Sequence, residues 1–102
     1  MNILFLEDRG SVSFYLKENL HNRGHVVYEA SSIPEATSIW RENKIDCLIV
    51  DLNLTPEGLT EEEIELTRNG LLTGWIWLKR HIFPDHPLMK KRTIILSEYL
   101  AS

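Results

Sequence analysis

The sequence predicts an α/β fold built on a doubly wound parallel sheet. Short apolar runs alternate with segments of helical periodicity. Two of these runs, 2–6 and 47–50, are continuous and rich in Val, Ile and Leu, which is typical of strands buried on both faces of a parallel sheet. Each run ends in acid: Glu7 and Asp8 follow the first, and Asp51 follows the second. The alternation implies right-handed crossovers, with helices on both faces of the sheet.

The segments between these two runs predict a helix, a strand and a second helix. The first helix is indicated by apolar residues at helical spacing, namely Val12, Tyr15, Leu16 and Leu20. Gly24 is expected to end it in a left-handed conformation, and 25–30 is expected to form a strand. Ser32 and Glu35 have the spacing of a capping box that starts the second helix. Its predicted buried stripe is Ala36, Ile39 and Trp40.

The connection after the second apolar run is long, and we interpret 55–70 as an acidic insertion beside Asp51. Thr60 and Glu63 form another capping-box pattern, which predicts a short helix. Asn69–Gly70 is a turn signal. A loop of this length beside a site is typical either of a lid or contact surface, or of a tolerated surface insertion.

The last predicted elements are a helix over 74–81 and a strand over 93–97. Trp75 and Trp77 lie two residues apart in this helix, so they cannot share a face. We expect one of them to pack in the core and the other to cover the insertion or a partner.

The composition fits a single small domain spanning 1–102. The net charge of −4 argues against a nucleic-acid-binding surface, which needs a basic patch. Cys47 is the one cysteine and lies in a predicted strand, which favours a reduced, cytoplasmic setting. We expect no signal peptide and no membrane span, because no apolar run has the required length.

Three segments together resemble the receiver domain of two-component response regulators. They are Ile3–Asp8, Asp46–Asp51 and Thr93–Ser97. The resemblance implies a flavodoxin-like receiver fold that stops after strand four. The family's fourth helix, fifth strand and fifth helix have no counterpart in this sequence. The lysine that ends the family's fifth strand and contacts the phosphoryl group is missing with them.

The resemblance also implies a set of site residues. Asp51 would be the phosphoacceptor, and Ser97 would hydrogen-bond a phosphoryl oxygen. Glu7, Asp8, Asp51 and the backbone carbonyl of Asn53 would hold Mg²⁺, which prefers oxygen ligands. Structural alternatives stay open: Asp51 as a turn residue after its strand, and Glu7 and Asp8 as solvated loop acids.

The function implied is that of a stand-alone receiver rather than an enzyme. It would take a phosphoryl group from a histidine kinase or phosphotransfer protein in a Mg²⁺-dependent phosphorelay and signal through protein contacts. Because strand four would be an open edge, we also expect a homodimer through the strand-four side.

Two other functions compete with this one. The missing lysine and missing fifth strand favour a phosphorylation-independent pseudo-receiver that acts as a dimerisation or interaction module. The spacing of Asp51, Asn53 and Thr55 is similar to a haloacid-dehalogenase phosphatase motif, but Asn53 stands where that motif needs an acid/base aspartate.

Overall fold

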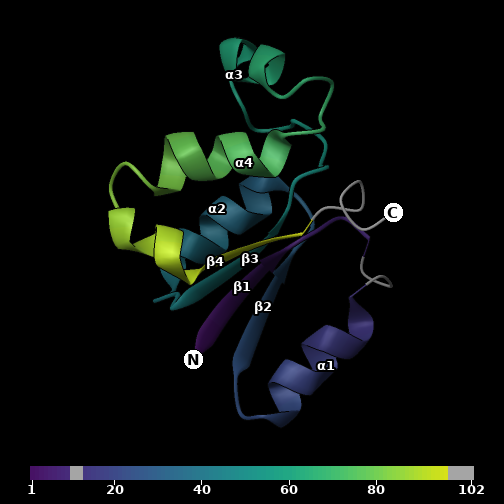
Figure 1. Ribbon diagram of the computed structural model, residues 1–102, viewed down its shortest axis with the longest axis vertical. Helices are drawn as coiled ribbons and strands as arrows, with labels where there is room; N and C mark the ends of the chain where they lie inside the picture. Colours follow the sequence, from purple (N-terminus) through teal and green to yellow (C-terminus); the bar gives the residue numbers. More distant parts are fainter. Residues whose placement is uncertain (10–12, 97–102) are drawn as a thin grey trace.

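The computed structural model describes residues 1–9 and 13–96 and shows an α/β fold around a four-stranded parallel sheet (Figure 1). The strands are β1 (Asn2–Leu6), β2 (Val26–Ala30), β3 (Cys47–Asp51) and β4 (Thr93–Leu96). Their order across the sheet is β2-β1-β3-β4, so β1 and β3 are central. This confirms the predicted α/β class, and the order is consistent with a flavodoxin-like fold.

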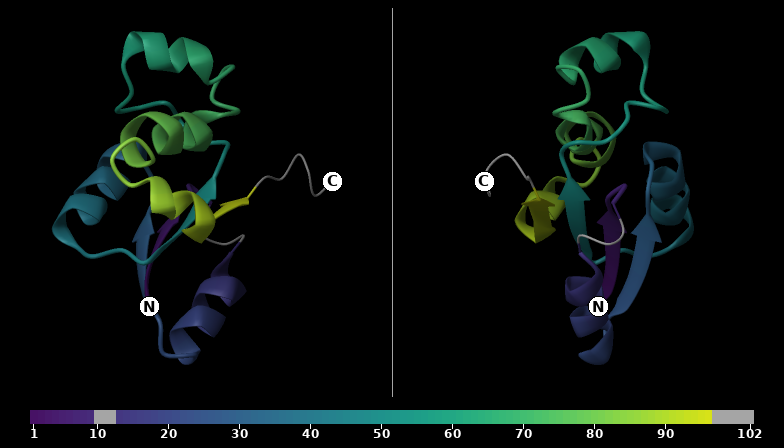
Figure 2. Two further views of the ribbon diagram at one scale, coloured as in Figure 1. Left: turned by 60° about the vertical axis from the view of Figure 1, so that its left-hand side comes forward. Right: turned by 90° about the vertical axis from the view of Figure 1, so that its right-hand side faces the viewer.

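Helices cover both faces of the sheet (Figures 1 and 2). One face carries α1 (Phe14–Asn22), whose Leu20 packs on a small core of Ile3, Phe5 and Ile49. The other face carries α2 (Ile33–Glu42) and α4 (Thr73–Trp77), with α4 continuing into a π-helical segment, η1 (Leu78–Ile82). A short 3-10 helix, η2 (Pro87–Arg92), leads into β4. Doubly wound topology is therefore present in the described part of the chain.

The larger core lies between the sheet and the α2–α4 face. Ala36 is fully buried there, and Ile39 and Trp40 pack against the same cluster, as predicted. Trp77 is fully buried, whereas Trp75 is 37 % exposed, which confirms that the two indoles lie in different environments. Most of the burial energy of the domain therefore comes from this face.

The helix predicted from the apolar spacing is present as α1, but its apolar residues do not share one buried face. Tyr15 is 83 % exposed and Leu16 is 43 % exposed, and Val12 lies outside the described residues. Of the predicted apolar residues, Leu20 meets the sheet, and Ser13 and Lys17 lie on the same face at helical spacing. Apolar periodicity alone did not distinguish the two faces, because Lys17 buries its stem while its ammonium reaches carboxylates.

The start of α2 is capped almost as predicted. Ser32 Oγ accepts a hydrogen bond from the Glu35 backbone N–H at 3.3 Å. The Glu35 carboxylate accepts a hydrogen bond from the Ser31 backbone N–H, one residue earlier than a capping box requires. The Ser32 cap is therefore present, but the second hydrogen bond of a capping box, from the Ser32 N–H to Glu35, is replaced by one from the Ser31 N–H.

The predicted insertion contains α3 (Glu61–Leu66), which lies beyond the carboxyl ends of the strands, above α4 in Figure 1. Both bonds of its Thr60–Glu63 capping box are present. The predicted turn follows, with positive φ at three successive residues, Arg68, Asn69 and Gly70. The short helix and its turn are therefore confirmed.

Within the described residues, β4 pairs with β3 alone and leaves its other side open. Ile94 is 53 % exposed and Ile95 is 41 % exposed, one on each face of the strand. None of the helices in 1–9 and 13–96 combines the length and apolar character that crossing a bilayer needs.

Candidate functional site

Two buried carboxylates stand at the carboxyl ends of the central strands. Leu6 of β1 pairs with Val50 of β3, so Glu7 and Asp51 follow at neighbouring positions. Glu7 is 5 % exposed and Asp51 is 8 % exposed. Phe5 and Ile49, which lie two residues before these acids, belong to the core on the α1 face. Side chains two residues apart in a strand point to the same face, so both carboxylates point toward the α1 face. The parallel sheet therefore places these two predicted site residues together.

Glu7 is held by two side chains of the segment that forms α1. The Ser13 hydroxyl donates a hydrogen bond to Glu7 Oε1. Lys17 Nζ contacts the same oxygen at 3.1 Å and reaches Glu29 Oε1 of β2 at 2.8 Å. Its ammonium also lies 4.8 Å from the centre of the Phe5 ring. Glu7 is thus a paired, hydrogen-bonded carboxylate rather than a solvated loop acid.

Lys17 is a site residue that sequence reasoning missed. Burial alone would lower the pKa of its ammonium, but hydrogen bonds and charge from Glu29 and Glu7 outweigh it, so the pKa is raised above 10.5. The signal was present in the spacing, because Ser13 and Lys17 lie four residues apart and share a helical face. The role of this spacing could not be predicted, because Glu7 and Glu29 lie in other segments of the chain.

Asp51 also takes part in the turn that follows β3. Its Oδ1 accepts a hydrogen bond from the Asn53 backbone N–H at 3.0 Å. This is the local bond expected of an aspartate that starts a turn. Asp51 is therefore a turn residue, as the structural alternative expected. The hydrogen bond to Asn53 also holds the carboxylate at the carboxyl end of β3.

Gly74 brings the start of α4 directly against this strand end. A Cβ on Gly74 would lie 2.1 Å from the Asp51 carbonyl oxygen and 2.8 Å from Val50 Cγ1. The Gly74 N–H donates to the Leu52 carbonyl at 3.1 Å. Only glycine permits this approach, so α4 braces the backbone that carries Asp51.

The remaining predicted site residues lie apart from this arrangement or outside the described chain. Asp8 is exposed, and Asn53 is half-buried. Ser97 lies outside the described residues. In 1–9 and 13–96, no three His, Cys, Asp or Glu side chains are grouped so as to hold a metal ion. With Lys17 and Ser13 on Glu7, this arrangement does not fit Mg²⁺, and magnesium stays a prediction.

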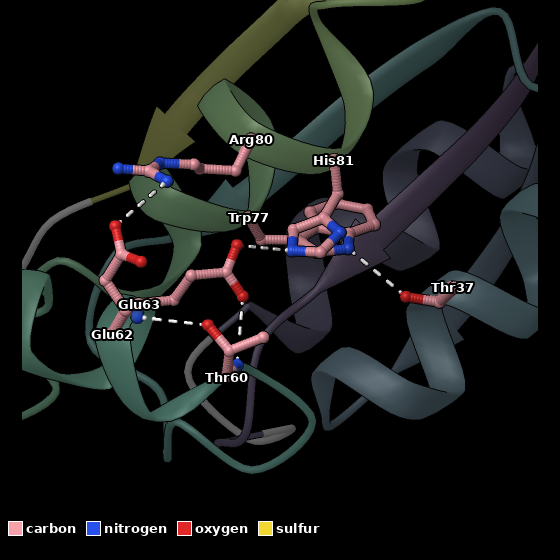
Figure 3. A network of polar contacts seen from close by, with 7 residues as sticks. All are labelled: Thr37, Thr60, Glu62, Glu63, Trp77, Arg80 and His81. Carbon is pink, nitrogen blue, oxygen red and sulfur yellow. Dashed lines mark hydrogen bonds and ion pairs between the residues drawn. The ribbon is translucent and has the colours of Figure 1, made fainter.

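A second polar network fastens the insertion to η1 (Figure 3). Glu63 Oε1 accepts the Thr60 N–H at 2.9 Å, and Oε2 lies 2.8 Å from His81 Nε2. Glu63 is 6 % exposed. Burial raises its pKa, but the Thr60 N–H and the His81 imidazole outweigh burial, so the pKa lies below 4.5. The insertion is therefore docked on the helix that braces Asp51.

Two contacts support this docking. Trp77 Nε1 donates to Thr37 Oγ1 of α2 at 3.2 Å, which fixes the helix from the other side. Arg80 lies 3.7 Å from Glu62 in a solvent-exposed pair of small energetic weight. The capping box was readable from the sequence, but the partnership of Glu63 with His81 was not, because they are eighteen residues apart.

Comparisons of the chain with models of protein families, with curated proteins and with solved structures gave no significant match. The functional interpretation therefore depends on the residues and topology described above.

Proposed function

We propose that this chain is a receiver-type phosphoacceptor domain whose Asp51 takes a phosphoryl group from a histidine kinase or phosphotransfer protein. The main support is the position of Asp51 at the carboxyl end of a central parallel strand, next to Glu7. Ligands of open parallel sheets bind at this edge. The strand order β2-β1-β3-β4 and the three motif segments agree with the receiver pattern.

The reaction proposed is a nucleophilic displacement at phosphorus. A carboxylate oxygen of Asp51 bonds to phosphorus while the bond from phosphorus to the donor atom breaks, and the donor keeps that electron pair. The product is an acyl phosphate on Asp51. The start of α4 braces the Asp51 backbone, and α3 lies beyond the same carboxyl edge of the sheet. Together they would present the phosphorylated edge to a protein partner. We place the domain in the cytoplasm, in keeping with its free Cys47 thiol.

Intact mass after incubation with acetyl phosphate tests the proposal. We expect wild type to gain one phosphoryl group and Asp51→Asn to gain none. Asp46→Asn is a matched control, because its carboxylate lies at the opposite end of β3 and accepts the Asn2 N–H. No gain in wild type with or without Mg²⁺ would reject phosphoacceptor function.

One observation favours a second candidate, a phosphorylation-independent interaction module. Glu7 is already neutralised by Lys17 and hydrogen-bonded by Ser13, so the acid pair is stable without a metal or phosphoryl group. In this case the open β4 edge would carry the function by pairing with a second copy of the chain. Asp51→Asn would then leave dimerisation and partner binding unchanged, whereas loss of either in that variant would count against this candidate.

A further inference from the structure

The exposed side of α4 and η1 carries a small aromatic cavity. Trp75 of α4 and Phe83, which directly follows η1, lie edge to face with their ring centres 6.3 Å apart. Together with Lys79, Pro84 and Lys90 they line a hollow of about 250 Å³. The Phe83 side chain is buried, whereas the Trp75 indole is exposed. The helix therefore leaves a large aromatic ring open to solvent beside a cavity.

The rim of this cavity is positively charged. Among the described residues that line it, Lys79 and Lys90 are charged and none is acidic. The Lys90 ammonium lies 5.9 Å from the centre of the Phe83 ring. Within 1–9 and 13–96, no carboxylate lies at ion-pairing distance from either ammonium. Two cations beside an aromatic surface are therefore available to an anionic partner, although the chain as a whole carries a net charge of −4.

We propose that this hollow, called the Trp75 cavity below, is a docking site for an acidic segment of another protein. The segment would place one aromatic side chain against Trp75 and Phe83, and its carboxylates would pair with Lys79 and Lys90. The proposal goes beyond the phosphoacceptor function and does not depend on phosphorylation of Asp51.

The size and shape of the Trp75 cavity favour a peptide side chain as the occupant. Clefts that enclose small-molecule ligands have volumes of roughly 300–1,000 Å³. A hollow of about 250 Å³ is smaller than these, and it matches one large side chain better than a whole cofactor. The two rings meet at 71°, so they form no parallel slot for a nucleobase. An aromatic side chain can extend this edge-to-face arrangement, and exposed tryptophans are frequent anchors of protein interfaces.

The charge on the rim determines which protein segments fit. Each solvent-exposed ion pair contributes little to affinity, so the buried aromatic side chain must supply most of it. Charge complementarity instead sets specificity and the rate of association. A basic segment would bring like charges against Lys79 and Lys90, whereas an acidic one neutralises them. An acidic segment with one aromatic anchor therefore satisfies both features of the Trp75 cavity.

NMR titration of the full chain with a capped pentapeptide, acetyl-Glu-Glu-Phe-Glu-Glu-amide, tests the proposal. We expect the indole N–H signal of Trp75 to shift and to saturate, because the peptide ring would lie against this indole. The Trp77 indole is the internal control: its ring is fully buried, it donates to Thr37, and its signal should not move. Trp75→Phe identifies the Trp75 signal. An unmoved Trp75 signal at millimolar peptide would overturn the proposal.

Two double variants and a second peptide separate the charges from the anchor. Lys79→Gln with Lys90→Gln should weaken peptide binding by at least about fivefold, because two ion pairs are lost. Lys44→Gln with Lys91→Gln is the matched control, since it makes the same charge change at exposed positions outside the cavity and should bind like wild type. Replacing Phe by Ala in the peptide should abolish the shift. Equal affinities of the two double variants, or equal binding of the two peptides, would overturn the proposal.

Light scattering tests whether a second copy of this chain is the occupant instead. We expect Lys79→Gln with Lys90→Gln to have the same mass in solution as wild type. A shift of this variant toward the monomer, with no peptide binding by wild type, would assign the cavity to an interface between copies and overturn the proposal. Failure of Asp51 to accept a phosphoryl group would reject the proposed function and leave the peptide result valid.

Discussion

Glu63 is the residue through which the insertion acts on the rest of the domain. Its carboxylate closes the α3 capping box and also meets His81 of η1. We expect Glu63→Gln to lower the free energy of unfolding by about 1–2 kcal/mol, because a charge-assisted bond and part of the cap are lost. Glu62→Gln is the control and should cost less than about 0.5 kcal/mol, since the Glu62 side chain is 79 % exposed. Urea denaturation at neutral pH measures both, and equal effects would contradict the role of Glu63.

The lowered pKa of Glu63 predicts how this contribution depends on pH. A carboxyl group whose folded pKa lies below its unfolded value stabilises the fold above the unfolded pKa, here about 4.5, and the stabilisation is lost as pH falls through the folded pKa. The difference in unfolding free energy between wild type and Glu63→Gln should therefore shrink as pH falls below about 4. A difference that grew on acidification below this pH would have the wrong sign.

At the residue scale, the sequence indicated the acids but not the side chains that hold them. Glu7 and Asp51 were found because each ends an apolar run. Lys17 and His81 were missed because each matters only through a carboxylate on another element. Such partnerships depend on tertiary placement, which local spacing does not encode.

At the scale of elements, α4 approaches the end of β3 closely at Gly74. We expect Gly74→Ala to destabilise the domain by more than about 3 kcal/mol, because the new methyl group would meet backbone and the Val50 side chain. Gly24→Ala is the control: its φ is +90°, but no atom lies within 4 Å of a Cβ there. It should cost only about 1 kcal/mol of backbone strain. Thermal unfolding compares them, and an equal cost would contradict a close approach at Gly74.

Elements with local signals were predicted correctly. The Thr60–Glu63 box and the Ser32 cap lie within one helical turn, so the chain itself specifies them. The helix predicted over 74–81 occupies 73–82, but its second half is π-helical, which the apolar pattern did not show. The apolar pattern likewise did not show that Lys17 faces the sheet, because its ammonium pairs with acids of other segments.

At the scale of the whole molecule, the sheet topology followed from the alternation of strands and helices. The parallel arrangement then brought Glu7 and Asp51 together without any further information. The role predicted for Ser97 falls outside the described residues, and the magnesium ligands stay a prediction, because Lys17 and Ser13 already hold Glu7. The arrangement of the strands was thus more predictable than the charged side chains that pair at the site.

The open edge of β4 predicts association with a second copy. Light scattering at micromolar concentration should give about twice the 11.9 kDa chain mass. Ile94→Lys should shift the mass toward the monomer, because a lysine on an edge strand opposes pairing. Ile64→Lys is the control, since Ile64 is exposed on α3, away from the sheet. A monomeric wild-type chain would contradict the prediction.

Trapping the acyl phosphate with hydroxylamine tests the central claim most directly. Hydroxylamine displaces phosphate from an acyl phosphate and leaves a hydroxamate on the side chain, which peptide mass spectrometry locates. After treatment with acetyl phosphate and Mg²⁺, we predict a hydroxamate on Asp51 and on none of the other acids. A hydroxamate on a different side chain, or none at all, would contradict the claim that Asp51 is a phosphoacceptor.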